Sequence, residues 1–243
     1  MRAVPLLVLS VVLSVVPSVV LSVALPAHAR PRPRLATKPA KPANRSAAKV
    51  VTILGNITRT LKSTRYHHAT RVSPKRGVYD WDCSGMVDWI LRRSAPRAQR
   101  AMRSGRPLAR DYYNVILGSP TGKARRGWQR LHGPRDARPG DLFAWLKPPH
   151  WRRKTTGHVG FLLSRPRRHR VWARIWLMKV ADASRYRHEN DSRPAGGPGG
   201  FGTGTIAFLV DTQGAPLAYG WYGSPQPPNT FVRTQIVFGR VTN

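Results

Sequence analysis

Cys83 is the residue whose surroundings point most directly to chemistry. It is the one cysteine among 243 residues, so it has no disulfide partner within the chain and is either a structural thiol or a reactive one. Asp82 is a good helix N-cap, and apolar residues follow at helical spacing: Met86, Val87, Ile90 and Leu91. A thiol in the first helical turn meets unpaired N–H groups and the positive end of the helix dipole, which favour a thiolate. The same amides could hold a developing oxyanion, and we place Ser84 with them on the oxyanion or substrate side.

A thiolate nucleophile needs a base that takes its proton and later gives it to the leaving amine. Among eight histidines, His158 has the best context, because the segment 157–163 predicts a strand. Side-chain alternation places His158, Gly160 and Leu162 on one face of that strand. The small Gly160 leaves space there for a ligand backbone. We expect five other histidines at the surface: His67, His68, His132, His150 and His169.

A third group should hydrogen-bond the far nitrogen of the imidazole and fix its tautomer. Asp182 lies near the end of the strand-like segment 171–184, which could pair beside His158. His188 and Asn190, in the loop that follows, are alternatives for this role. The structural alternative for Asp182 is a turn cap at the end of its strand.

The elements that must position these residues form two groups. Residues 50–63 and 95–116 predict helices. Strands are predicted at residues 142–146, 159–163, 171–180, 205–210, 217–222 and 231–241. The fold class is therefore α+β, with N-terminal helices packed on a C-terminal antiparallel sheet of about six strands. Residues 193–204 contain so much glycine that we expect a loop that does not pack.

Five motifs follow one another in an informative order. They are Tyr66, Asp82-Cys83-Ser84-Gly85, Pro139-Gly140-Asp141-Leu142, Gly157-His158-Val159-Gly160 and Val180-Ala181-Asp182-Ala183. Together, over about half of the chain from Tyr66 to Ser184, they resemble the NlpC-type cysteine peptidases of bacterial cell walls, a papain-like family.

The resemblance implies a papain-like fold in which Cys83 is the nucleophile, His158 the general base and acid, and Asp182 the orienting residue. It also implies that Tyr66, with Tyr79 as the alternative, lines the oxyanion side. No cofactor and no metal are expected. The chain departs from the family pattern in two places: many relatives have a neutral third member, and the segment 64–81 lacks the paired glycines common before the nucleophile.

The N-terminal segment predicts export. Residues 1–29 combine a positive start, an apolar stretch and an Ala-His-Ala site, which is typical of a secretory signal peptide, with retention as a membrane anchor as the alternative. Residues 30–49 are basic and proline-rich and predict a linker, which leaves residues 50–243 as a peptidase domain. We therefore expect a secreted, periplasmic or cell-envelope protein.

Charge constrains the partners. Residues 50–243 hold 34 of the 42 Lys and Arg residues and all 10 acidic residues, a net charge of +24. Such a field favours polyanionic partners, and we expect peptidoglycan and anionic envelope polymers. We expect no specific nucleic acid, because 33 of the 42 basic residues are Arg spread along the chain and no nucleic-acid motif occurs.

The sequence thus predicts a monomeric thiol hydrolase that cleaves peptide or amide bonds in peptidoglycan stem peptides through a thioester. The alternative is a catalytically silent basic module that binds anionic envelope polymer. Metal-dependent hydrolysis is not favoured, because the sequence has no His-Glu-x-x-His motif and no paired cysteines.

Overall fold

Asn44 starts the first helix of the computed structural model, which describes residues 40–243. Its side-chain oxygen accepts a hydrogen bond from the Ala47 amide at 2.9 Å, a standard N-cap. The helix α1 (Arg45–Thr60) buries Val50, Leu54 and Ile57, which recur at helical spacing. Residues 45–49 therefore belong to the helix and not to the linker expected there, because Asn44 can cap a helix ahead of the apolar stripe. The predicted signal segment and residues 30–39 lie outside the described residues.

A small three-stranded sheet follows α1 and was not predicted. Its strands are β1 (Ser63–Tyr66), β2 (Arg71–Ser73) and β3 (Val78–Trp81). The short helix η1 (Pro74–Arg76) connects β2 to β3. Strand β3 lies between the other two, parallel to β1 and antiparallel to β2. Tyr66 pairs with Trp81, two residues before Cys83. This register brings the end of β1 to the start of the next helix.

That next helix, α2 (Cys83–Ser94), begins at the cysteine as expected. The predicted helical region at residues 95–116 is divided into α3 (Pro96–Arg100) and α4 (Ala109–Leu117). The intervening loop contains Gly105 and Pro107, which favour a break. Among residues 40–243, no helix has both the length and the hydrophobicity needed to cross a bilayer.

The C-terminal half forms one sheet of nine strands, where the sequence predicted about six. Its strands are β4 (Trp128–Leu131), β5 (Leu142–Leu146), β6 (Gly157–Leu162), β7 (Arg167–Arg168), β8 (Ile175–Ser184), β9 (Gly200–Val210), β10 (Pro216–Gly220), β11 (Val232–Arg233) and β12 (Ile236–Val241). The order is β11-β10-β9-β8-β6-β5-β12-β4, all antiparallel, with β7 beside β8. The short helices η2 (Pro134–Asp136) and η3 (Pro228–Thr230) lie in its connections.

The sheet has more strands than predicted, in part because one predicted strand is divided into two. Residues 231–241 divide into β11, which pairs with β10, and β12, which pairs with β5 and β4. Strands β4 and β7 are short and were not predicted. The α+β class and the large antiparallel sheet are confirmed.

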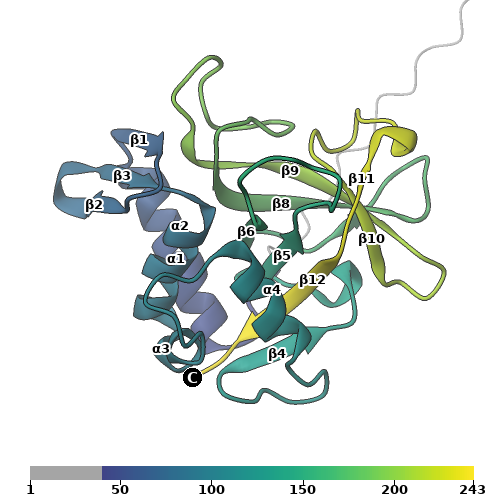
Figure 1. Ribbon diagram of the computed structural model, residues 1–243, viewed down its shortest axis with the longest axis horizontal. Helices are drawn as coiled ribbons and strands as arrows, with labels where there is room; N and C mark the ends of the chain where they lie inside the picture. Colours follow the sequence, from purple (N-terminus) through teal and green to yellow (C-terminus); the bar gives the residue numbers. More distant parts are fainter. Residues whose placement is uncertain (1–39) are drawn as a thin grey trace, which may run out of the picture. The chain divides into compact units, whose positions relative to one another are not determined.

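The sheet carries an apolar cluster on each face. One cluster joins the helices to the sheet and includes Met86, Ile90 and Phe161. Helices α1 and α2 stand beside the sheet, and α4 lies over β5 and β12 (Figure 1). The other cluster, which includes Trp145 and Phe208, is formed by the sheet strands themselves. His158 and Leu162 alternate with Val159 and Phe161, so His158 lies on the face of this second cluster.

The Pro139-Gly140-Asp141-Leu142 motif has a structural role at the start of β5. Gly140 has φ +87°, and a Cβ atom there would lie 2.3 Å from the Ala47 carbonyl oxygen of α1. Arg240 of β12 donates from Nε and Nη2 to the two carboxylate oxygens of Asp141 at 3.0 and 2.8 Å. Burial raises the pKa of Asp141, although Arg240 acts in the opposite direction. The motif thus joins α1, β5 and β12.

Candidate functional site

Asp82 shapes the start of α2 around the cysteine. Its Oδ1 accepts hydrogen bonds from the Gly85 amide at 2.8 Å and from the Ser84 hydroxyl at 3.0 Å. The first intrahelical bond runs from the Met86 amide to the Asp82 carbonyl oxygen. The amides of Cys83 and Ser84 precede it and have no intrahelical partner. Ser84 can therefore contribute its amide, while its buried hydroxyl is engaged by Asp82.

Gly85, at the third helical position, is closely packed. A Cβ atom there would lie 2.4 Å from Thr70 Oγ1 and 3.3 Å from Asp82 Oδ1. A larger residue would push against the cap that fixes the helix start. The glycine of the Asp-Cys-Ser-Gly motif therefore protects the geometry of the cysteine.

Strands β6 and β8 bring His158 and Asp182 together. They are antiparallel, with Phe161 opposite Ala181, so side-chain alternation places His158 and Asp182 on the same face. The two side chains meet at 2.7 Å between Nε2 and Oδ2. Because Nε2 is engaged by Asp182, Nδ1 is the nitrogen left for the thiol. The pairing expected from the sequence is confirmed.

The protonation of His158 is coupled to the cysteine. Burial by itself lowers the pKa of His158, but the negative charge of the Cys83 thiolate and the hydrogen bond with Asp182 raise it more. The resulting pKa of His158 is about 9. Near neutral pH, the arrangement therefore favours a protonated His158.

Asp182 lies at the centre of a buried charge cluster. Its Oδ2 also meets His188 Nε2 at 2.8 Å, and its Oδ1 accepts from Arg193 Nη2 at 2.8 Å. Burial alone would raise the pKa of Asp182, but the charges of His188 and Arg193 hold it well below its usual range. Asp191 in turn binds Arg193 at 2.8 Å. Asp182 is thus an ionised carboxylate despite complete burial.

His188 was an alternative third member, and the structure places it behind Asp182. Its Nδ1 faces the Trp221 carbonyl oxygen at 3.2 Å, and its Nε2 faces the Asp182 carboxylate. Both partners are hydrogen-bond acceptors, so His188 bridges the Asp182 carboxylate and the Trp221 backbone. The other alternative, Asn190, is exposed to solvent. Asp182 is therefore the group that meets His158.

Arg193 is the residue that sequence reasoning missed. It lies in the glycine-rich segment that was expected not to pack, yet it is 4% exposed. That expectation was wrong: the glycines allow close approach, and a Cβ at Gly202 would lie 2.4 Å from Arg193 Nε. The available signal was electrostatic, since a buried Asp182 requires a cationic partner.

Tyr66, and not Tyr79, lies at the site. Tyr66 lines the same cleft as Cys83 and His158. Burial raises the pKa of Tyr66, and the negative charges of Cys83 and Asp82 raise it further. Tyr79 is buried in the core and its hydroxyl is 2.8 Å from Thr60 Oγ1.

These residues open onto a cleft of about 980 Å³. Trp145 and Trp221 flank the imidazole of His158, with ring centroids 5.1 and 5.4 Å away. The β5–β6 loop and the segment after β8 form the mouth, where Arg153 and Arg185 are exposed. The cleft is thus aromatic beside the imidazole and cationic at its mouth.

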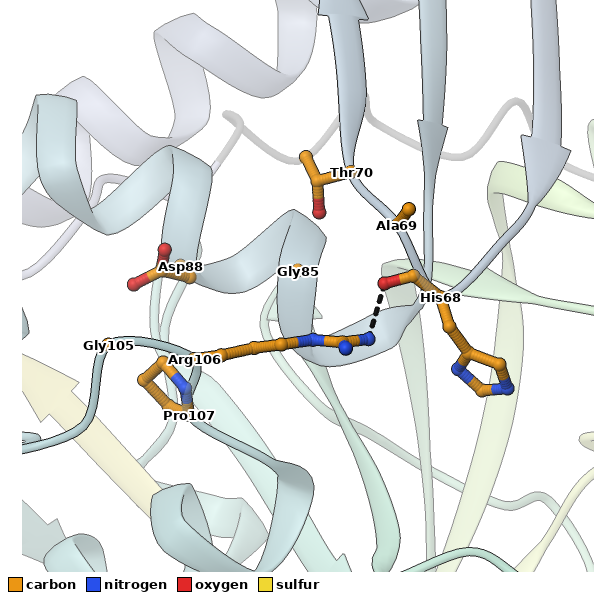
Figure 2. Close-up of a pocket in the computed structure, with 8 residues that line it drawn as sticks. All are labelled: His68, Ala69, Thr70, Gly85, Asp88, Gly105, Arg106 and Pro107. Carbon is orange, nitrogen blue, oxygen red and sulfur yellow. Dashed lines mark hydrogen bonds between the residues drawn. The ribbon is translucent and has the colours of Figure 1, made fainter.

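A smaller pocket of about 300 Å³ lies beside the start of α2 (Figure 2). Arg106 crosses it and donates a hydrogen bond to the His68 carbonyl oxygen. Its guanidinium is also 3.5 Å from Asp82 Oδ2. His68 and Arg106 line both spaces, so Arg106 marks the boundary between this pocket and the cleft.

Comparisons with known proteins give one distant relative. The chain is 27% identical over 159 residues to an uncharacterised protein of Acanthamoeba polyphaga mimivirus, covering 58% of this chain and 67% of that protein. No family model matches the chain. No solved structure matches it either.

Proposed function

We propose that the chain is a thiol hydrolase of peptide or amide bonds, with Cys83 as nucleophile, His158 as general base and acid, and Asp182 as the residue that orients His158. The observation that carries the proposal is the assembly of a cysteine in the first turn of α2, an imidazole bonded at 2.7 Å to a buried carboxylate, and an open cleft. A sheet-borne histidine facing a helix-borne cysteine also supports a papain-like fold.

The proposed reaction has two steps. The Cys83 thiolate adds to the substrate carbonyl carbon, and the amides of Cys83 and Ser84 stabilise the oxyanion. The C–N bond breaks, His158 gives its proton to the leaving amine, and a thioester remains on Cys83. His158 then takes a proton from water, which attacks the thioester and releases the acid and the thiolate.

We propose that the substrate is a peptidoglycan stem peptide and that the protein acts outside the cytoplasm. The positive charge of the chain supports this substrate, since the polymer carries carboxylates and the field would concentrate the enzyme on it. The signal-like residues 1–29 support export.

Release of soluble muropeptides from purified peptidoglycan tests the proposal. Wild-type protein is expected to release fragments that mass spectrometry assigns to one broken amide bond, while Cys83→Ala releases none. Asp136→Asn, an exposed change outside the cleft, is the matched control and should stay active. Equal release by wild type and Cys83→Ala would reject the assignment and leave a basic binding module.

A further inference from the structure

The cleft mouth holds cations that no carboxylate neutralises. Four basic side chains line it away from Arg106: Lys147, Arg153, Lys154 and Arg185. None of these four forms an ion pair with an acidic residue within residues 40–243. Among the residues that the structure describes, the only carboxylate lining the cleft is Asp82, which is bound to the start of α2 and to His68. The cleft therefore has unpaired positive charge where a substrate enters.

Three of these cations make contacts with residues of the cleft. The Arg185 guanidinium lies over the Tyr66 ring, 5.4 Å from its centroid, and lowers the pKa of Tyr66 against the effect of burial and Cys83. Arg153 donates to the hydroxyl of Tyr186, the residue after Arg185, at 3.3 Å. Lys147 donates to the Arg153 carbonyl oxygen at 3.3 Å. Cationic side chains thus line the cleft both beside Tyr66 and on the β5–β6 loop.

Aromatic side chains line the cleft together with these cations. Tyr186 is 54% exposed and Tyr222 56% exposed, and both line the cleft. The Arg153 guanidinium lies 5.9 Å from the centroid of the Trp151 ring. Exposed aromatics offer flat contact surface, and guanidinium groups bind carboxylates with directed hydrogen bonds. The combination fits a peptide that carries a negative charge.

We infer that Arg185 and Arg153 form an anion subsite that selects substrates with a free carboxylate near the bond to be cut. The inference rests on the proposed function and specifies its substrate class. A substrate in which that carboxylate is amidated keeps the shape and loses the charge. Because hydrogen bonds to charged groups contribute more than neutral ones, the amidated substrate should bind more weakly.

Binding by the Cys83→Ala protein tests the subsite without turnover. Two synthetic stem peptides that differ only in a carboxylate or a carboxamide beside the scissile bond are titrated by calorimetry. The free carboxylate should bind roughly 10-fold more tightly, and Arg153→Gln with Arg185→Gln should abolish the preference. The control, Arg167→Gln with Arg170→Gln, removes the same charge from exposed positions outside the cleft and should keep it.

Hydrolysis by the otherwise wild-type enzyme provides the second readout. The double change at Arg153 and Arg185 should raise KM for the free-carboxylate peptide more than KM for the carboxamide peptide, because the lost contacts are those to the carboxylate. Equal affinity for the two peptides, or an equal loss in the Arg167 and Arg170 variant, would overturn the subsite. Hydrolysis of both peptides with the same kcat/KM rejects the subsite and keeps the hydrolase, while preferential binding without hydrolysis rejects the hydrolase and keeps the subsite.

Discussion

At the scale of single residues, the proposed reactivity depends on the proton that His158 carries. His158 has a pKa of about 9, above the 6.5 of a free imidazole, because the effects of Cys83 and Asp182 exceed that of burial. The imidazolium is therefore present below about pH 9 and is lost as the pH rises through that value. The protonated His158 stabilises the folded protein fully below the unfolded-state pKa near 6.5. This stabilisation is lost as the pH rises through the folded-state pKa of about 9.

The alkaline limb of the pH profile follows from this shift. We expect kcat/KM for peptide hydrolysis to fall above about pH 9, because neutral His158 cannot protonate the leaving amine. Initial rates between pH 6 and 10.5 measure the limb, with circular dichroism showing that the protein stays folded. A limb near pH 6.5 would contradict the coupling between Cys83 and His158.

Asp182 is expected to act through His158. The Asp182→Asn variant loses the charge that holds the imidazole, and hydrolysis should fall by roughly 10²- to 10⁴-fold. Because His188 and Arg193 also bind Asp182, its melting temperature should fall too, so rates are compared at a temperature where the variant is folded. Asp136→Asn serves as the control. A folded Asp182→Asn protein with full activity would remove Asp182 from the mechanism.

At the scale of elements, the Asp141–Arg240 pair joins β5 to β12. Arg240→Ala leaves a buried carboxylate without its cation, which costs about 3–5 kcal/mol of unfolding free energy. Denaturant unfolding monitored by tryptophan fluorescence measures the loss. Arg233→Ala, an exposed change on β11, should have little effect. Equal stability of the two variants would show that the pair does not stabilise the sheet.

The sequence predicted elements that local signals determine and missed those that depend on tertiary contacts. Cys83 begins its helix because Asp82 caps it, and residues 142–146 form β5 with the predicted bounds. The three-stranded sheet at residues 63–81 was missed, since its short strands gain their order from pairing with β3 and carry little apolar pattern. Strands β4 and β7 were missed because they too are short and are ordered by pairing with a neighbouring strand.

The sequence anticipated the contact between His158 and Asp182 at the centre of the candidate site and missed the residues around it. Cys83, His158 and Asp182 stand in motifs with local structure, so their order along the chain was informative. Arg193 supports Asp182 from a loop whose glycines look unstructured in sequence, and only the packing of Gly202 against it reveals its position. Long-range ion pairs of this kind leave no periodic signal.

At the scale of the whole molecule, charge should control binding to the envelope. The chain has a net charge of +32 with neutral histidines. We expect Cys83→Ala to sediment with purified cell walls at low salt and to be released near 1 M salt, where the Debye length is about 3 Å. Bound and free protein after centrifugation measure this. Binding that does not change with salt would show that charge has no part in it.

The reactivity of Cys83 tests whether this thiol is an activated nucleophile. Cys83 is the only cysteine of the chain and lines the cleft. Alkylation by iodoacetamide at pH 6 is followed by mass spectrometry beside glutathione as a model thiol. We expect Cys83 to react about 10-fold faster than the model thiol, and the His158→Gln change to remove this advantage. A wild-type Cys83 that reacts no faster than glutathione, or a His158→Gln protein that reacts as fast as wild type, would contradict it.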